Sequence, residues 1–325
     1  MTTRRVRVGV IGTGALGFHH ARLYRTLPDA QLVGVYDHHP GRGDQVGREL
    51  GTVAFPTLEA LLDQVEAVSV VVPTKAHADV GLAVLSRGIA ALMEKPLADT
   101  LESAERLVRA ADAAGATLQV GHVERFNRAV RAAAPYLDGP RFLQCERLAP
   151  FQPRGTDVAV VLDLMIHDLD LVLELVHAEV TEVRAAGAPL LTPHVDIANA
   201  RVEFANGAVA LVTASRVTPK RTRTLRIFQP TGYFSLDLAQ GTGHYYELKP
   251  GWQAMGARHL EEIVRHVKLS APEAEPLALE LESFVRAVRG DGDVVVSGAA
   301  GLQALTLAYR VADAIQASPL TAARP

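Results

Sequence analysis

The stretch that decides the fold is VRVGVIGTGALG, residues 6 to 17. Residues 6 to 11 form a mostly apolar run that predicts a buried strand, and Gly12, Gly14 and Gly17 follow it in a G-x-G-x-x-G pattern. Glycines at this spacing allow a tight turn and a close approach of the backbone to a pyrophosphate. The pattern is weak evidence alone, but its position between a strand and a helix predicts a dinucleotide site.

The second predicted strand, residues 31 to 36, is followed by Asp37. A carboxylate in that place accepts hydrogen bonds from both ribose hydroxyls of NAD and repels the 2′-phosphate of NADP. We therefore expect NAD, although His38, His39 and Arg42 lie close enough to weaken the discrimination. The alternative for Asp37 is an ordinary surface turn. The cofactor-binding residues expected from these two motifs are Gly12, Gly14, Ala15, Leu16, Gly17 and Asp37.

Strand and helix patterns alternate over the first 120 residues, which predicts a doubly wound parallel sheet with ligands at the carboxyl ends of its strands. After Val120 the extended segments lengthen, and Asn206-Gly207 and Thr231-Gly232 predict hairpins. The second part is therefore expected to be α+β with an open, mostly antiparallel sheet. Residues 239 to 276, rich in Gly, Pro and His, are expected to form a loop over the substrate cleft. The expected domains are residues 1–122 for cofactor binding and 123–325 for substrate binding and oligomerisation.

Composition places the chain among globular enzymes. It has 325 residues, of which 48% are hydrophobic and 21% charged, and its net charge of −3 gives no general attraction to nucleic acid or to an anionic membrane. Cys145 is the single cysteine, which excludes an intrachain disulfide and a cysteine-based metal cluster, so we expect no metal and a cytoplasmic location. No apolar run reaches the roughly 20 residues that cross a bilayer.

Glu94-Lys95-Pro96 ends another predicted apolar strand. The chain has only five lysines among its 33 Lys and Arg residues, so a lysine in this place suggests proton chemistry, for which arginine is unsuited. The alternative is a side chain that extends into solvent. Pro73, Thr74 and His77 follow a neighbouring strand and are expected to border the nicotinamide half of the cofactor; alternatively, Pro73 ends the strand and Thr74 caps the next helix.

Asp163 and His167 lie four residues apart in a predicted helix, residues 160 to 177, and would share one face of it. A carboxylate beside a histidine orients the ring and raises its basicity, which suits a general acid or base. Two alternatives stay open here. In the first, the pair forms a structural salt bridge. In the second, it contributes to a metal site, but no further His or Cys at ligand spacing accompanies it, which argues against a metal.

These motifs together resemble the glucose-fructose oxidoreductase/inositol dehydrogenase/MocA family, and the resemblance covers nearly the whole chain. Besides the glycine loop and Asp37, the segments that carry it are Glu94-Lys95-Pro96, Gly121 to Asn127 (GHVERFN) and Asp163-x-x-x-His167. The resemblance implies a nicotinamide-dependent sugar dehydrogenase, with an active site between a Rossmann domain and an open-sheet domain. Within the family, the segments around Arg125 and His167 look most like those of enzymes that oxidise UDP-N-acetylhexosamines at C3.

The resemblance also implies roles for individual residues. Lys95 lies next to the nicotinamide and the reacting hydroxyl, His167 is the general base, and Asp163 orients the sugar, while Glu94 helps to hold the cofactor. A nucleotide sugar further needs cations for its diphosphate, and several lie in segments that border the expected cleft. The candidate substrate-binding residues are Lys95, Arg125, Asn127, Arg154, Asp163 and His167, with Lys220, Arg221 and Arg223 as further cations.

Two classes of function compete at this point. One is an enzyme acting on a nucleotide sugar, or alternatively on an inositol, a free sugar or a trans-dihydrodiol; the other is a non-catalytic dinucleotide-binding regulator. Retention of Lys95, Asp163 and His167 favours the enzyme, because a regulator has no need of proton-transfer groups. We also expect a homodimer or homotetramer formed by the open sheet, and a cis Lys95-Pro96 peptide bond. The apolar positions expected on the exposed face are Val195, Ile197, Val209, Leu211, Leu225 and Ile227.

Overall fold

The computed structural model describes residues 4–152, 158–256 and 259–317. The chain divides into two compact units, the first made of residues 1–123 and 275–305 and the second of residues 124–274 and 306–325. The division expected at residue 122 gave each domain one continuous segment. In the structure, residues 275–305 return to the first unit.

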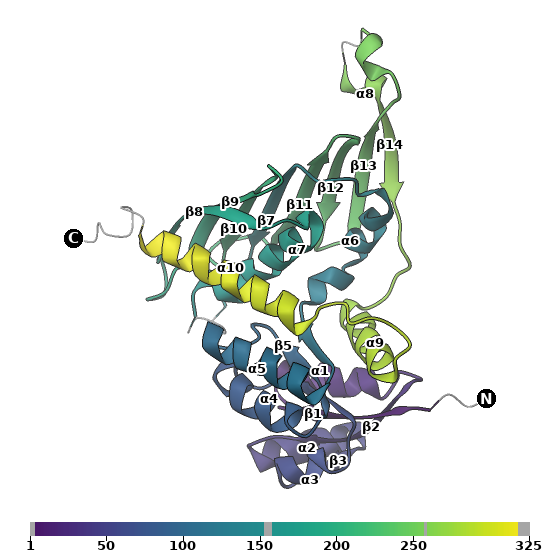
Figure 1. The fold of residues 1–325 in the computed structure, drawn as a ribbon, viewed down its shortest axis with the longest axis vertical. Coiled ribbons are helices and arrows are strands. Elements are labelled where there is room, and N and C mark those ends of the chain that lie inside the picture. Colours follow the sequence, from purple (N-terminus) through teal and green to yellow (C-terminus); the bar gives the residue numbers. More distant parts are fainter. Residues whose placement is uncertain (1–3, 153–157, 257–258, 318–325) are drawn as a thin grey trace. The chain divides into compact units, whose positions relative to one another are not determined.

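The first unit contains a six-stranded parallel sheet in the order β3-β2-β1-β4-β5-β6 (Figure 1). The strand order reverses between β1 and β4, which makes this the edge where ligands of doubly wound sheets bind. The strands are β1 Val6–Ile11, β2 Ala30–Tyr36, β3 Val53–Ala54, β4 Ala67–Val70, β5 Ala90–Glu94 and β6 Leu118–Gly121. The helices are α1 Ala15–Tyr24, α2 Pro40–Leu50, α3 Leu58–Leu62, α4 His77–Leu85, α5 Leu101–Ala114 and α9 Pro276–Arg289. The sequence-based prediction of a doubly wound domain is confirmed.

Helices cover both faces of this sheet because β1 is apolar on both sides. Val8 is fully buried in a core that includes Tyr24 of α1 and Phe284 of α9. On the other face, a Cβ atom added to Gly9 would lie 2.9 Å from Leu61 of α3. Helix α9, almost 270 residues after β1, therefore completes the hydrophobic core of the first unit.

The second unit is built on an eight-stranded sheet in the order β14-β13-β12-β11-β7-β10-β9-β8, and only the β7–β10 pair is parallel. Both predicted hairpins are confirmed: Gly207 (φ +80°) and Gly232 (φ +143°) take the backbone conformations that favour glycine. The strands are β7 Phe142–Leu148, β8 Val180–Ala188, β9 Ile197–Phe204, β10 Val209–Ser215, β11 Thr222–Gln229, β12 Gly232–Asp237, β13 Thr242–Leu248 and β14 Val264–Leu269. The helices are α6 Arg128–Ala133, α7 Ile166–Val176 and α8 Leu260–Ile263, and α10 Gly298–Gln316 runs from the first unit into the second.

The loop expected over residues 239 to 276 is wrong. This segment forms the antiparallel pair β13 and β14, with α8 at the end of their hairpin (Figure 1). Its alternation explains the difference: the Tyr245 ring stacks on Phe234 at a centroid distance of 4.3 Å and is buried, whereas His244 points to the opposite face. The high content of Gly and His suggested a loop, although buried and exposed side chains alternate along this segment as they do in a strand.

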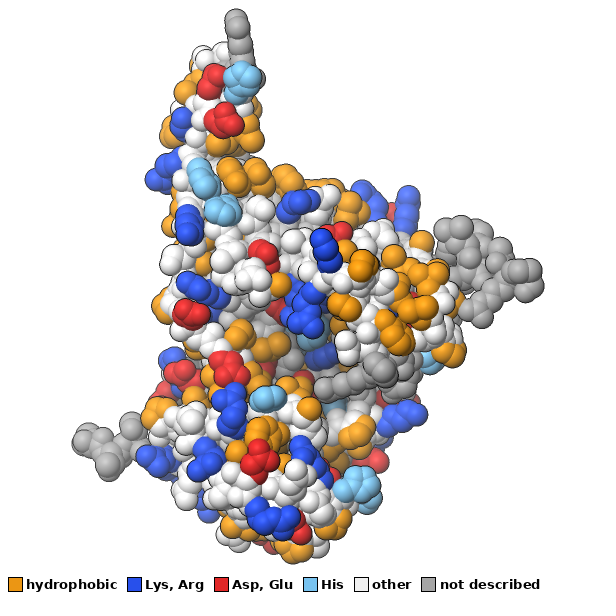
Figure 2. Space-filling view, turned by 180° about the vertical axis from the view of Figure 1, so that it is seen from behind, with side chains coloured by type: hydrophobic (Ala, Val, Ile, Leu, Met, Phe, Trp, Pro, Cys, Tyr) orange, Lys and Arg blue, Asp and Glu red, His pale blue; other side chains and the backbone are white. Residues whose placement is uncertain are grey.

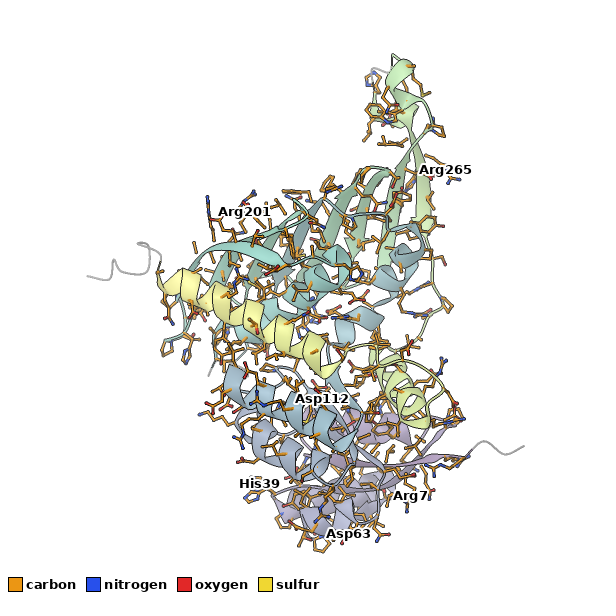
Figure 3. The ribbon with its side chains drawn as sticks, viewed as in Figure 1. Arg7, His39, Asp63, Asp112, Arg201 and Arg265 are labelled. Atoms are coloured by element: carbon orange, nitrogen blue, oxygen red, sulfur yellow. The ribbon has the colours of Figure 1, made fainter. Side chains whose placement is uncertain are left out.

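The two faces of this sheet differ, and three residues expected on the exposed face, Leu225, Ile227 and Val195, lie on the covered one. Leu225 and Ile227 are 0% and 1% exposed, because they lie beside the buried residues Cys145 and Leu143 of β7. The half-buried Leu211 instead shares the open face with its cross-strand neighbour Arg201, which points away from α7 in Figure 3.

The open face keeps part of the apolar character that the sequence predicts. Ile197 and Val209 are half-buried at open-face positions. Val195, just before β9, lies on the covered side instead, because the Cβ position of Gly187 is 2.8 Å from it and 3.2 Å from Ile315 of α10. Figure 2 shows hydrophobic side chains exposed among charged ones on the second unit. Among the described residues, no helix is long and apolar enough to cross a membrane.

The tightest packing in the first unit gives a prediction about stability. A Cβ atom on Gly17 would lie 1.9 Å from the carbonyl oxygen of Gly12, so Gly17→Ala must push α1 away from β1. We expect a loss of roughly 1 to 3 kcal/mol, the usual cost of overpacking, measured as a lower melting temperature in calorimetry. Gly14→Ala is the matched control, since nothing lies within 4 Å of its Cβ position and its φ is −60°. Equal melting temperatures for the two variants would contradict this account.

Candidate active site

The glycine loop lies at the carboxyl end of β1 and leads directly into α1. Gly12 has φ +88°, and Gly17 packs against it, so the chain turns sharply and α1 begins at Ala15. Gly14 precedes the first helical residue and faces open space. Backbone N–H groups and the positive end of the helix dipole therefore converge where an anion can approach closely, which fits the pyrophosphate of a dinucleotide.

Asp37, immediately after β2, is fixed as a carboxylate. One of its oxygens accepts from the backbone N–H (2.7 Å) and the hydroxyl (2.8 Å) of Thr13, and the other accepts from the N–H of His39 (2.9 Å). Burial raises the pKa of Asp37, but these donors outweigh burial and lower it below its ordinary value. Its negative charge thus stays beside the glycine loop. The nearby Arg42 guanidinium donates to the Thr13 carbonyl oxygen (2.8 Å) and to Gln45 (3.0 Å).

Glu94, the last residue of β5, is braced inside the first unit. Its carboxylate lies 3.1 Å from Nε2 of His20 on α1 and accepts from the backbone N–H of Lys95 at 3.2 Å. Burial raises the pKa of Glu94, but His20 and Lys95 outweigh it and lower the pKa, so the group stays ionised. Gly121 leaves room for this carboxylate, since a Cβ atom there would lie 3.0 Å from it.

The turn after Glu94 is also held from its other side. The Lys95-Pro96 bond is cis, as the sequence-based prediction expected. His77, which is 1% exposed, places Nδ1 2.9 Å from the Pro96 carbonyl oxygen and Nε2 3.0 Å from that of Val72. Both ring nitrogens therefore face backbone carbonyls, and neither is turned toward a cofactor.

Pro73 and Thr74 follow β4 at the same edge of the sheet. Pro73 precedes a 3₁₀-helical turn, Thr74–Ala76, and α4 begins directly after this turn at His77. The N-cap of α4 is Ala76, two residues after Thr74, so the alternative capping role of Thr74 is wrong. Its half-exposed side chain stays a candidate contact for the cofactor.

In the second unit, Asp163 and His167 lie at the start of the helix that the sequence predicts, but the helix is not regular there. Residues Val161–Met165 form a π-helical turn, and α7 begins at Ile166. The helix expected at residues 160 to 177 is thus present, with its first turn wider than an α-helical turn because its hydrogen bonds span one residue more. Such turns are frequent at functional sites. Both side chains are partly exposed.

A buried charge network holds α7 to β7. Arg147 donates twice to the Asp168 carboxylate (2.7 and 2.8 Å) and once to Glu124 (2.8 Å). Burial alone would lower the pKa of Arg147, but the two carboxylates raise it, and all three side chains are at most 6% exposed. Because Asp168 follows His167 directly, this network fixes the backbone that carries the candidate base.

Arg216 and Asp196 brace the chain that enters the π turn. Arg216 donates to the carbonyl oxygen of Val158 (2.6 Å), and the Val160 N–H donates to Val195 (2.9 Å). The buried Asp196 carboxylate accepts three backbone N–H groups and the Thr192 hydroxyl. Burial raises the pKa of Asp196, but these donors outweigh it and lower the pKa to about 2.

Two of the expected substrate ligands are committed to structure. The Arg125 guanidinium binds Asp170 twice (2.7 and 2.9 Å) and also Glu174, which leaves its side chain 7% exposed. Asn127 caps α6 by accepting from Ala129 and donates to Glu124. Neither side chain is therefore available to a diphosphate in this arrangement. The sequence could not show this, because it does not tell which carboxylates bind them in the folded chain. Arg154 lies outside the described residues.

Arg223 on β11 is the better placed cation. It lies directly across from Arg147, and its side chain is 36% exposed, with one long contact of 3.4 Å to Glu124. Burial and repulsion by Arg147 and Arg221 lower the pKa of Arg223. An anion bound here would relieve that repulsion. Lys220 and Arg221 precede it at exposed positions.

Two residues that organise these two sets of side chains, Arg147 and His20, were not found from the sequence, and the position of a third, His77, was given a different role. Arg147 carried a signal, because it continues the inward-facing series Leu143 and Cys145 on β7, and a charge in that phase requires a buried partner. His20 carried a weaker one, as a polar residue on the buried face of α1. His77 was singled out, but with a different role. Among the described residues, no group of three His, Cys, Asp or Glu side chains could hold a metal ion.

Known proteins resemble this chain in both of its units. Residues 6–122 match a model described as an oxidoreductase family with an NAD-binding Rossmann fold, and residues 140–235 match the GFO/IDH/MocA C-terminal domain. UDP-N-acetylglucosamine 3-dehydrogenase of Acidithiobacillus ferrooxidans is 39% identical over 96% of this chain and 98% of its own length. A solved structure of that enzyme has a TM-score of 0.88 at 37% identity, with 96% and 98% of the two chains covered. The scyllo-inositol 2-dehydrogenase (NAD+) of Bacillus subtilis is 33% identical over 66% of this chain and 68% of its own length.

The environment of Asp37 predicts cofactor preference. We expect the wild type to bind NAD at least a hundredfold more tightly than NADP, because the ionised carboxylate repels a 2′-phosphate. Asp37→Ser should weaken NAD binding roughly tenfold through the lost charged hydrogen bonds, and should strengthen NADP binding. Calorimetric titration with both cofactors measures this, and Asp63→Ser, whose wild-type side chain is 65% exposed, is the control. Similar affinities of the wild type for the two cofactors would refute the assignment.

Proposed function

The chain belongs to the GFO/IDH/MocA family of oxidoreductases with an NAD-binding Rossmann fold, and we propose that it oxidises UDP-N-acetylglucosamine at the 3-hydroxyl to the 3-keto sugar. The observation that carries this substrate is the 39% identity with a UDP-N-acetylglucosamine 3-dehydrogenase over 96% of the chain. The alternatives within the family are an inositol, a free sugar or a trans-dihydrodiol.

The proposed chemistry is an alcohol oxidation. NAD supplies the hydride acceptor when bound, so the C3–H bond breaks and both of its electrons leave with the hydrogen. His167 takes the proton of the 3-hydroxyl, and the C3–O bond becomes a carbonyl. Asp163 holds the sugar in orientation, and Lys95 donates a hydrogen bond to the oxygen on which negative charge develops. The hydrogen bonds of Glu94 hold the backbone next to Lys95, and those of Asp168 hold the backbone next to His167.

The diphosphate of the proposed substrate would bind through Arg223, Arg221 and Lys220. Arg223 supports this because its guanidinium is partly exposed and lies in a field that its cationic neighbours make favourable for an anion. Binding energy from a group remote from the reacting carbon can orient the sugar and so contribute to the rate of hydride transfer.

A homodimer or homotetramer in the cytoplasm completes the proposal. The half-buried Ile197, Val209 and Leu211 lie on a sheet face that helices leave open, and a second subunit would remove their apolar area from water. Light scattering at micromolar concentration tests this, and a monomer would count against it. The single cysteine, Cys145, is buried and suits a reducing compartment.

The substrate is tested by incubating the purified protein with NAD and UDP-N-acetylglucosamine, following NADH at 340 nm, and identifying the sugar product by mass spectrometry. Coupling to an aminotransferase and an amine donor removes the ketone if the equilibrium is unfavourable. We expect a 3-keto nucleotide sugar. A product from myo-inositol or a free hexose, with none from the nucleotide sugar, would overturn the proposal.

The anion site gives a second, independent prediction. Arg223→Gln should raise KM for UDP-N-acetylglucosamine roughly tenfold, the usual effect of losing a charged hydrogen bond, and leave KM for NAD unchanged. Arg226→Gln is the matched control, because it removes the same charge three residues later on the opposite face of β11. Steady-state kinetics of both variants decide the matter, and an equal effect of the two substitutions would exclude a specific role for Arg223.

A further inference from the structure

His77 joins two segments of the first unit that lie far apart in the sequence. It is the first residue of α4 and is 1% exposed. Its Nδ1 lies 2.9 Å from the carbonyl oxygen of Pro96 and 3.3 Å from that of Leu97, and its Nε2 lies 3.0 Å from that of Val72. One imidazole ring therefore spans the end of β4 and the turn that carries Lys95.

The chemistry of these contacts limits what the ring can do. A carbonyl oxygen only accepts hydrogen bonds, so each ring nitrogen binds its carbonyl only when it carries a proton. Burial lowers the pKa of His77, against the raising effects of the carbonyls and of Glu94, which favours a neutral ring with one N–H. The Nδ1 side offers that N–H two acceptors, Pro96 and Leu97, whereas the Nε2 side offers one.

Pro96 makes the Nδ1 contact important. A proline has no backbone N–H, so its carbonyl oxygen is its only backbone hydrogen-bonding group. On the preceding side, the Lys95 N–H is held by Glu94 at 3.2 Å. We propose that His77 is a positioning residue, which holds the Lys95-Pro96 turn through the Pro96 carbonyl and thereby orients Lys95 for the reaction. This inference rests on the proposed function for its kinetic readout.

Two substitutions separate the two sides of the ring. Asparagine places its amide nitrogen near the position of Nδ1, and His77→Asn keeps a donor toward Pro96. Glutamine places its amide nitrogen near that of Nε2, and His77→Gln keeps a donor toward Val72 alone. We expect His77→Asn to retain kcat within about threefold and His77→Gln to lose roughly ten- to a hundredfold, the effect of misplacing a catalytic group by about an ångström. The dissociation constant of NAD should stay unchanged in both.

A double-mutant cycle with Lys95→Met distinguishes positioning from general structural support. If His77 acts through Lys95, His77→Gln will not lower kcat further once Lys95 is replaced, because interacting residues are not additive. Equal kcat for His77→Asn and His77→Gln, multiplicative losses in the cycle, or weakened NAD binding in both single variants would each overturn the proposal.

Hydrogen–deuterium exchange keeps this test separate from the substrate assignment. Amides in residues 94–98 should exchange faster in His77→Gln than in His77→Asn, with no substrate present. If the wild type fails to oxidise UDP-N-acetylglucosamine, the proposed function fails, and exchange alone decides the role of His77. Equal exchange rates in this segment for the two variants would then refute the proposal that His77 holds the Lys95-Pro96 turn.

Discussion

The close approach of α1 to the end of β1 is the constraint on which the first unit depends. Only a residue without a side chain fits at position 17, because a Cβ atom there would lie 1.9 Å from the Gly12 carbonyl oxygen. This contact fixes where α1 begins, and one turn later His20 reaches the Glu94 carboxylate at 3.1 Å. The glycine loop and the lysine-bearing turn are thus parts of one rigid arrangement, although about 80 residues separate them in the sequence.

In the second unit, a buried arginine has the corresponding role. Removing Arg147, Asp168 and Glu124 from water costs free energy, and their mutual hydrogen bonds offset that cost only when all of them form together. Such a network therefore tolerates one arrangement of β7 and α7. Its contribution is better regarded as fixing where α7 lies than as a large gain in stability. Arg223 shares Glu124 with this network and is left partly exposed beside it.

Features set by interactions between residues close in the sequence were predicted correctly, and features set by contacts between distant segments were not. The glycine loop and Asp37 obey local rules of strand, turn and helix, and both occupy the predicted places. The strands β13 and β14 were missed because pairing at a sheet edge, not composition, makes them strands. Leu225 and Ile227 have the right period, but alternation alone does not tell which face a helix covers.

The sequence by itself determined the two architectures, the dinucleotide loop and the residue types of a candidate proton-transfer set, because these depend on hydrophobic period, glycine spacing and side-chain chemistry within short segments. Only the tertiary structure decided which charges are free to meet a ligand. Arg125 and Arg223 are equivalent as letters, yet Asp170 and Glu174 neutralise the first, whereas the second shares a single carboxylate contact. The reason is physical: a charge acts through distance and burial, and both are set by segments that meet only when the chain folds.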